Sequence, residues 1–377
     1  MKEQVNIYLC GANFHPGEVT TNCFMETSKA NLDDSFLYSH LANIFDINVV
    51  EKPKDADVVF LAQPRDKYDY SDISDKVICF VAPENVFPDL SYVDYAVSPN
   101  LELRSCRRHF YIPGSLMGTP NTLKDWELMH HKHEISFGEE EKYLQREFCA
   151  RVVSNDTDAA PERLAFFLQL SKYKMVDSGG GSRNNVGGRV KDKRAFLASH
   201  KFSLQFENMY NSWISEKLDS GFAAGTVPIY WGNPDVSEIY NEKAFINCHK
   251  YGSFQEVIEE VKRLDHDDEA YMEMLRQPAL KVDMDKSSDE YGKELEKFFS
   301  RVVQAGKQGK KECVNYNWYG DMQRIYSQGL KAFFFEKNCK NAFIHVIHYP
   351  WTLIRKIPGM QEKRDAFFAR KKNAVDC

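Results

Sequence analysis

Near the middle of the chain, the hydrophobic period changes twice in a way that is typical of β/α architectures. Residues 201–206 alternate apolar and polar side chains, as a strand does. An apolar residue then recurs every fourth position over 214–222, which predicts a helix with Ser212 as its N-cap and Gly225 at its end. The apolar run 227–231 is a second strand. We therefore expect a strand–helix–strand crossover of the kind that builds nucleotide-binding sheets.

Two β/α halves are expected around this crossover. The first 120 residues contain short apolar runs of the kind found in a parallel sheet that is covered on both faces. These runs are residues 5–9, 47–50, 58–62, 77–82, 95–97 and 110–112. Residues 32–45 have helical spacing, and the polar segment 121–146 reads as a surface connection. A second half begins at Glu147, with further elements at 148–153, from Pro161 onward, at 244–247 and at 254–276.

Composition limits the classes of protein that remain. The chain has 377 residues, enough for about two domains, and its 43% apolar and 28% charged residues are typical of a globular protein. A net charge of −6 excludes a globally basic surface that would capture nucleic acid nonspecifically. Nine cysteines without a CxxC pair indicate free thiols, and the N-terminus resembles neither a signal peptide nor a signal anchor. We therefore expect a cytoplasmic protein.

Polar residues at the crossover are candidates for ligand binding. Ligands of open α/β sheets lie beyond the carboxyl ends of the strands, where Asn208 follows the first strand of the crossover. Glu216 and Lys217 open the next helix, so that Lys217 suits a phosphate oxygen and Glu216 suits a ribose diol. The alternative is an ordinary exposed Glu–Lys pair, which the spacing alone favours.

Three other features have both a functional and a structural interpretation. Arg163 falls in a first helical turn, where its cation and the helix dipole suit a diphosphate, or where the side chain simply faces solvent. Glu84 follows the strand at 77–82 and is either a general base or a turn carboxylate. The glycine-rich segment 177–193 lets backbone N–H groups approach an anion, or it forms a surface loop.

Two motifs raise the question of a metal ion. Three histidines lie in the sequence HHKHE at 130–134, although an isolated polar cluster of this kind is more often solvated. Asp156 and Asp158 form a DxD pattern after a strand, and paired carboxylates hold Mg²⁺ or Mn²⁺ on nucleotide-sugar phosphates in some transferases. The DxD patterns at 265–267 and 283–285 read as solvated faces.

The longest motif of the chain resembles the signature block of the α-1,3/4-fucosyltransferases, glycosyltransferase family 10. Three segments carry the resemblance: KFSLQFEN (201–208), WISEKLDSGFAAGTVPIYWGNPDV (213–236) and AFINCHKYGSFQEVIEEVKRL (244–264). Bacterial members have similar counterparts of the glycine-rich segment, of PERLAFF (161–167) and of PENVFPDLSYVDYAV (83–97). They also have a His-His-Lys stretch similar to that at 130–132, and this likeness favours a linker over a metal site at 130–134. The resemblance covers about residues 45–280.

This resemblance implies a GT-B architecture, in which two Rossmann-like α/β domains face each other across a cleft that holds the active site. The acceptor-binding domain would be residues 1–146, including the polar connection, and the GDP-fucose-binding domain would be 147–335. A basic, aromatic, helical tail would follow at 336–377.

The resemblance also implies transfer of L-fucose from GDP-β-L-fucose to a sugar hydroxyl with inversion. The matching positions are Glu84 for the general base, Arg163 and Lys217 for the donor diphosphate, and Glu216 for the donor ribose. Asn208 closes the FEN motif beside the donor. Trp213 stands where bacterial relatives carry tyrosine, so that only a packing role is carried over to it.

Substrates and cofactors follow from the same resemblance. No cofactor is expected to be required, because Arg163 and Lys217 neutralise the leaving GDP, and a divalent cation would at most stimulate the reaction. The expected acceptor is a GlcNAc hydroxyl, O3 by preference, of a LacNAc-type surface glycan. The alternative is a GT-B transferase with another nucleotide-sugar donor or linkage. A more distant alternative is a noncatalytic protein that binds a nucleotide sugar or a glycan.

The end of the chain poses a separate question. Residues 340–377 contain eight Lys or Arg against three Asp or Glu, with five aromatic residues among them. Such a segment suits peripheral attachment to the anionic cytoplasmic face of an inner membrane. A final helix that packs across the domains is an equal alternative. The N-terminus without an anchor separates the chain from Golgi-anchored relatives and is typical of a bacterial-type enzyme.

Overall fold

The computed structural model describes residues 2–10, 35–62, 73–81, 86–136, 138–157, 159–210 and 213–313. Glu84, Asp158, Ser212 and the tail 336–377 lie outside the described residues. Within the described ranges, no helix has the length and apolar character that crossing a bilayer requires.

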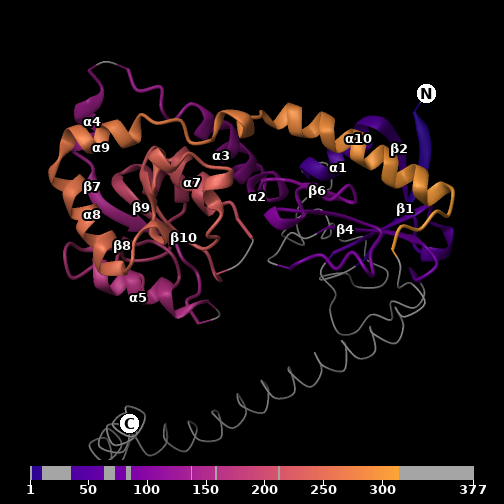
Figure 1. Cartoon of the computed structure of the whole chain (residues 1–377), viewed down its shortest axis with the longest axis horizontal. Helices are drawn as coiled ribbons and strands as arrows, with labels where there is room; N and C mark the ends of the chain where they lie inside the picture. Colours follow the sequence, from indigo (N-terminus) through magenta and orange to yellow (C-terminus); the bar gives the residue numbers. More distant parts are fainter. Residues whose placement is uncertain are drawn as a thin grey trace, which may run out of the picture. The chain divides into compact units, whose positions relative to one another are not determined.

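The first half forms a six-stranded sheet whose strands are all parallel to their neighbours, in the order β2-β1-β3-β4-β5-β6 (Figure 1). The strands are β1 (Glu3–Cys10), β2 (Phe45–Val49), β3 (Val58–Leu61), β4 (Val77–Val81), β5 (Tyr95–Ser98) and β6 (His109–Tyr111). Each corresponds to one of the apolar runs of the sequence. Every residue of β3 and β4 is buried, which explains why these strands read as continuous apolar runs.

Two helices from opposite ends of the described chain pack together on this sheet. Helix α1 (Phe36–Ile44) lies beside α10 (Ser288–Lys307), and His40 of α1 contacts Glu296 of α10 at 2.8 Å (Figure 1). Phe299 of α10 packs edge-on against Phe60 of β3. The sequence interpretation did not include α10. This helix falls within the range 147–335 assigned to the second domain, yet its core residues pack with those of the first sheet.

The second half forms a five-stranded parallel sheet in the order β11-β10-β9-β7-β8. Its strands are β7 (Glu147–Arg151), β8 (Val176–Ser178), β9 (His200–Phe206), β10 (Val227–Trp231) and β11 (Ile246–Asn247). The helices of this half are α5 (Pro161–Leu170), α6 (Lys193–Ala198), α7 (Lys217–Ala223), α8 (Phe254–His266) and α9 (Asp268–Leu275). Since β9 and β10 pair in parallel and α7 joins them, the predicted crossover is confirmed.

Helix α7 begins later than the sequence pattern predicted. Its first residue is Lys217, five positions after the expected cap at Ser212, and Glu216 occupies the N-cap position. The preceding residues are held in other ways: Trp213 forms an antiparallel bridge with Asn100 of the first half, and the backbone N–H of Ser215 donates to a carboxylate. The predicted end of the helix is correct, because Gly225 has a φ of 64°.

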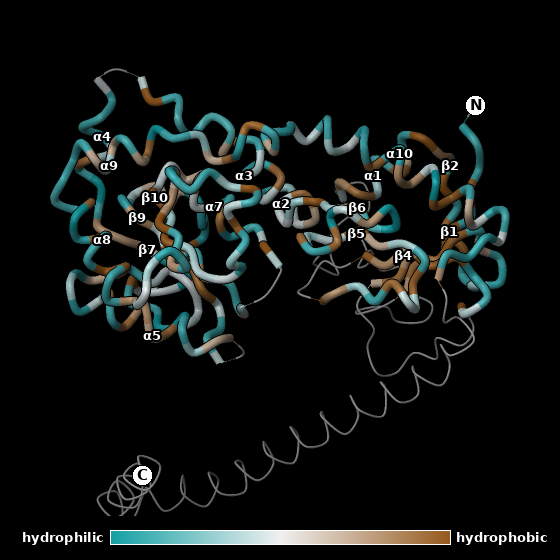
Figure 2. Tube along the Cα trace, viewed as in Figure 1, coloured by the Kyte–Doolittle hydropathy of each residue, from teal (hydrophilic) through white to brown (hydrophobic). Residues whose placement is uncertain are grey.

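The polar segment between the halves is only partly a surface connection. Helices α3 (Pro120–His130) and α4 (Glu140–Leu144) form within it, and α2 (Gly114–Met117) precedes it. Trp126 and Met129 of α3 are fully buried, and α3 packs against α7 of the second half. Figure 2 shows the resulting pattern: hydrophobic residues concentrate along strands such as β1 and β4, and hydrophilic residues cover the helices α4 and α9.

Candidate active site

A buried cluster of two arginines lies where β7 ends and α5 begins. Asp156 contacts Nη2 of Arg151 at 3.1 Å and Nε of Arg163 at 3.4 Å. Arg151 is 1% exposed and Arg163 is 5% exposed. Two guanidinium groups therefore share the carboxylate of Asp156, and the charge of Glu207 also acts on Arg163. The Nε atom of Arg163 is buried and makes no hydrogen bond among the described residues. Such a group suits an anionic ligand.

The same arginine is linked to the end of β9. One Nη1 hydrogen of Arg163 is donated to Oδ1 of Asn208, whose backbone carbonyl accepts a bond from the N–H of Ala160 at 2.7 Å. Asn208 is itself exposed. The structure therefore brings two of the predicted site residues, Arg163 and Asn208, into contact at the carboxyl edge of the second sheet.

Glu207 connects this edge to the start of α7. Its carboxylate accepts hydrogen bonds from the backbone N–H of Ser215 at 2.8 Å, from the Ser215 hydroxyl at 2.7 Å and from Nζ of Lys217 at 3.1 Å. A Cβ atom on Gly232 would lie 2.4 Å from the Cγ of Glu207, so that only glycine leaves room for this side chain. Glu207 is the middle residue of the FEN motif, and the motif alone does not reveal this role.

Lys217 and Glu216 are charged neighbours at the N-terminus of α7. Burial lowers the pKa of Lys217, but the charges of Glu207 and Glu216 outweigh this effect and the pKa is raised. Burial raises the pKa of Glu216, yet the charges of Lys217 and Lys193 outweigh it and this pKa is lowered. Both side chains are therefore ionised at neutral pH. A fixed ammonium group beside the arginine cluster is suited to binding a diphosphate.

The glycine-rich segment packs closely on the end of β7. A Cβ atom on Gly180 would lie 2.0 Å from the carbonyl oxygen of Val153, so that the two backbones require a glycine there. The hydroxyl of Ser182 donates to Asp156 at 2.6 Å. The part of this segment around Gly180 thus supports the arginine cluster.

Trp213 is buried, 6% exposed, in agreement with a packing side chain. Glu84, the predicted general base, lies outside the described residues, and its relation to this site is a prediction.

Three of the candidate metal ligands, Asp156, His130 and His131, are engaged in other contacts. Asp156 pairs with the two arginines, His131 contacts Glu134 at 2.9 Å and His130 contacts Asp285 at 3.3 Å. In the part of the chain that the structure describes, no three histidine, cysteine or acidic side chains are grouped so that they could hold a metal ion.

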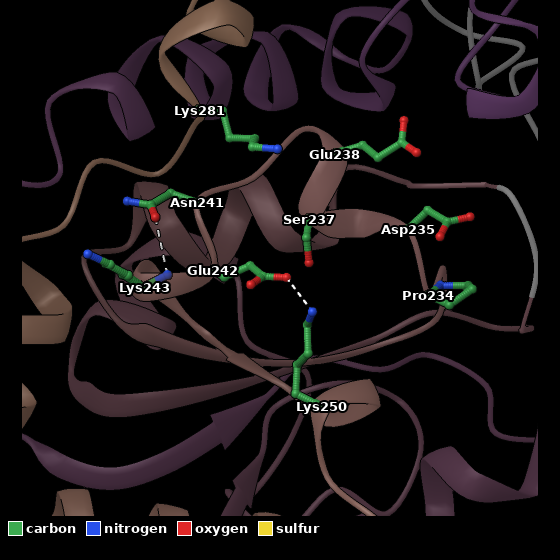
Figure 3. Close-up of a pocket in the computed structure, with 9 residues that line it drawn as sticks. All are labelled: Pro234, Asp235, Ser237, Glu238, Asn241, Glu242, Lys243, Lys250 and Lys281. Carbon is green, nitrogen blue, oxygen red and sulfur yellow. Dashed lines mark hydrogen bonds and ion pairs between the residues drawn. The ribbon is translucent and has the colours of Figure 1, made fainter.

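A separate polar cavity of about 480 Å³ lies beyond the ends of β10 and β11 (Figure 3). Lys250 and Glu242 form an ion pair of 2.7 Å inside it, and Lys281 points into it from above. Asp235 and Glu238 bring its acidic residues to three, against the three lysines Lys243, Lys250 and Lys281. Acidic and basic residues are thus equal in number around the cavity, whereas two buried arginines share Asp156 in the arginine cluster.

The fold and these residues define a class of protein. Two parallel α/β sheets, with cationic side chains at the carboxyl edge of the second sheet, form the GT-B architecture, and crystal structures support this assignment. The crystal structure of an α1,3-fucosyltransferase matches with a TM-score of 0.65 and 25% identity, over 80% of this chain and 91% of that chain. The crystal structure of an α1,3-fucosyltransferase with GDP matches with a TM-score of 0.62 and 25% identity, over 80% of this chain and 91% of that chain.

Sequence comparisons identify the family of the second half. Residues 143–318 match the family described as "Glycosyltransferase family 10 (fucosyltransferase) C-term", so this segment is a family 10 glycosyltransferase domain and the resemblance is confirmed. The α-(1,3)-fucosyltransferase FucT of Helicobacter pylori is 32% identical over 271 residues, which are 64% of this chain and 55% of that protein. The human GDP-fucose protein O-fucosyltransferase 3 is 29% identical over 136 residues, 32% of this chain and 28% of that protein. The chain thus spans about half the length of the bacterial relative.

Proposed function

We propose that the chain is an α-1,3-fucosyltransferase that uses GDP-β-L-fucose as its donor. The observation that carries the proposal is the pair of buried arginines sharing Asp156, with Lys217 nearby. These cationic side chains suit a donor diphosphate, and they suit the leaving GDP better still, because negative charge grows on GDP as the glycosidic bond breaks. Membership of residues 143–318 in family 10 supports fucose as the transferred sugar.

The proposed reaction inverts the configuration at fucose C1. Glu84 accepts the proton of the acceptor hydroxyl as its oxygen forms the new bond to C1 from the face opposite the phosphate. The bond between C1 and the β-phosphate oxygen breaks, and GDP leaves with the electron pair. Arg163 and Lys217 stabilise the charge on GDP, Glu216 binds the ribose diol, and Asn208 holds Arg163 in place. No metal ion is required in this scheme, so that activity should persist in EDTA.

The proposed acceptor is the O3 hydroxyl of GlcNAc in a LacNAc-type surface glycan. We place the reaction in the cytoplasm, with residues 340–377 in peripheral contact with the inner membrane. A panel of nucleotide sugars, followed by NMR of the product linkage, identifies both the donor and the linkage. Transfer from a donor other than GDP-fucose would contradict this proposal and support the alternative, a GT-B transferase with another nucleotide-sugar donor.

Substitution of Arg163 tests the charge argument directly. Arg163→Met should lower kcat/KM by about 10²–10³-fold and weaken GDP binding, because it removes a cation that acts on the leaving group. The matched control is Arg276→Met, since Arg276 forms an exposed ion pair with Glu140 away from the cluster. Equal activities of the two variants in a GDP-fucose transfer assay would contradict the role of Arg163.

A further inference from the structure

The helix that carries Lys217 is held in place by residues of the first half of the chain. Ser115 of α2 donates its hydroxyl to Oδ2 of Asp219, in the first turn of α7, at 2.6 Å. Ser115 is 1% exposed and Asp219 is 0% exposed, so this bond between the two halves is shielded from water. A hydrogen bond that is shielded from water is stronger than an exposed one.

Asp219 has a second hydrogen-bond partner, in the second half of the chain. The hydroxyl of Tyr240 donates to Oδ1 of Asp219 at 2.6 Å, and the Tyr240 ring stacks on that of Phe222 at 6.0 Å. Each carboxylate oxygen thus accepts one short bond, one from the first half and one from the second. Asp219 is fixed between these two hydroxyls, and its position fixes the rotation of α7 about its axis.

The backbone of α2 also touches the residues just before α7. A Cβ atom on Gly114 would lie 2.9 Å from the carbonyl carbon of Ser215 and 3.0 Å from the backbone nitrogen of Glu216. Gly114 and Ser115 therefore contact the segment that presents Glu216 and Lys217 to the ligand. A displacement of α2 would be transmitted directly to these two side chains.

We propose that Ser115 and Asp219 are positioning residues, through which the first half of the chain holds the donor-binding end of α7. The inference rests on the proposed function, because it concerns affinity for a GDP-containing donor. It goes further in assigning part of the donor affinity to a side chain of the half that is expected to bind the acceptor. Neither Ser115 nor Asp219 contacts the donor in this proposal; both act through Glu216 and Lys217.

Removal of the Ser115 hydroxyl separates positioning from stability. Ser115→Ala in the full chain should weaken binding of GDP about fivefold or more, measured by isothermal titration calorimetry. The KM for GDP-fucose should rise by a similar factor. A merely structural role predicts another result: the fraction of folded enzyme, and with it the apparent kcat, would fall while the KM and the Kd for GDP stayed constant.

Thr122→Val is the matched control. Thr122 donates its hydroxyl to the carbonyl of Ser115 at 2.9 Å and belongs to the same α2–α3 pair, but it makes no bond to α7 among the described residues. We expect its Kd for GDP to equal that of the wild type. If Ser115→Ala does not fold at the assay temperature, Tyr240→Phe removes the other hydrogen bond of Asp219 while retaining the ring, and the same increase in the Kd for GDP is expected.

The outcomes distinguish this inference from the proposed function. A wild-type chain that binds no GDP overturns the proposed donor and this inference together. A wild-type chain that binds GDP, with an unchanged Kd in Ser115→Ala or in its substitute Tyr240→Phe, overturns the positioning role alone. An increase in the Kd for GDP in Thr122→Val as large as that in Ser115→Ala also overturns the positioning role, because the effect would then come from general loosening of α2.

Discussion

Glu84 is the residue on which the proposed chemistry depends most, since it alone is assigned to the acceptor proton. Glu84→Gln keeps the size and polarity of the side chain but removes its basicity. We expect transfer to fall by about 10²–10⁴-fold, the usual contribution of a general base, while the Kd for GDP changes little. Fucosyl transfer and GDP calorimetry on the same preparation give the two readouts.

The control for this substitution is Glu127→Gln, because Glu127 is an exposed carboxylate of α3. Its transfer rate should equal that of the wild type. Near-normal transfer by Glu84→Gln would remove this residue from the role of base and direct attention to other carboxylates of the first half.

Asp219 predicts a dependence of stability on pH. Burial raises its pKa from 3.8 to about 7, although the hydroxyls of Ser115 and Tyr240 oppose this effect. Between these two values the folded protein binds more protons than the unfolded chain, so the contribution of Asp219 to stability is present at low pH and decreases as the pH rises to 7. The slope should be at most about 1.4 kcal/mol per pH unit.

Asp219→Asn removes this slope because an amide does not titrate. The melting temperature of the variant, relative to the wild type, should rise steadily between pH 5 and pH 7. A constant difference over this range would mean that the Asp219 carboxyl has an ordinary pKa in the folded protein.

The motifs of the sequence indicate candidate site residues but not the partners of these residues. Arg163, Asn208 and Lys217 were identified from the resemblance, and the structure places them at one sheet edge. Asp156 was considered as a metal ligand, but it is the counterion of Arg151 and Arg163. Such a pairing depends on which side chains the fold brings within 4 Å, and a sequence pattern does not contain that distance.

At the scale of secondary structure, burial decides what a sequence reveals. Strands such as β4 are buried along their whole length, so that their apolar runs identify them without ambiguity. Strand β8 has only three residues and pairs on one side, and it was not predicted. The start of α7 was misplaced because Ile214 fits the helical period although it precedes the helix. The hydrogen bonds from Ser215 to Glu207 hold the residues before Lys217 outside the helix, and the spacing of apolar residues does not reveal these bonds.

Helix α10 illustrates a different limit. Its buried residues Leu295, Phe298 and Val302 lie on one helical face, and a capping box at Ser287 and Glu290 marks its start, so the local signal for a helix was present. The sequence does not show on which of the two sheets the helix packs. Its residues follow the second sheet in the chain but complete the core of the first. A division of the chain into consecutive domains therefore assigns α10 by its position in sequence rather than by its packing.

At the scale of the whole molecule, charge is distributed unevenly along the chain. Residues 340–377 have a net charge of +5 from eight basic and three acidic residues, although the complete chain has a net charge of −6. A segment of this charge gains about 1 kcal/mol per basic residue near an anionic bilayer surface, and its aromatic residues suit the interface. Such a contact would bring the enzyme close to an acceptor that lies at a membrane surface.

Binding to vesicles tests this expectation on the full chain. Wild-type protein should co-sediment with vesicles that contain anionic lipid, and less so as the salt concentration rises, because the attraction is electrostatic. Replacement of Arg370, Lys371 and Lys372 by glutamine should lower the bound fraction, whereas replacement of the exposed Lys293 and Lys297 of α10 should not. Equal sedimentation of wild type and the triple variant would favour the alternative, in which the last segment packs on the protein itself.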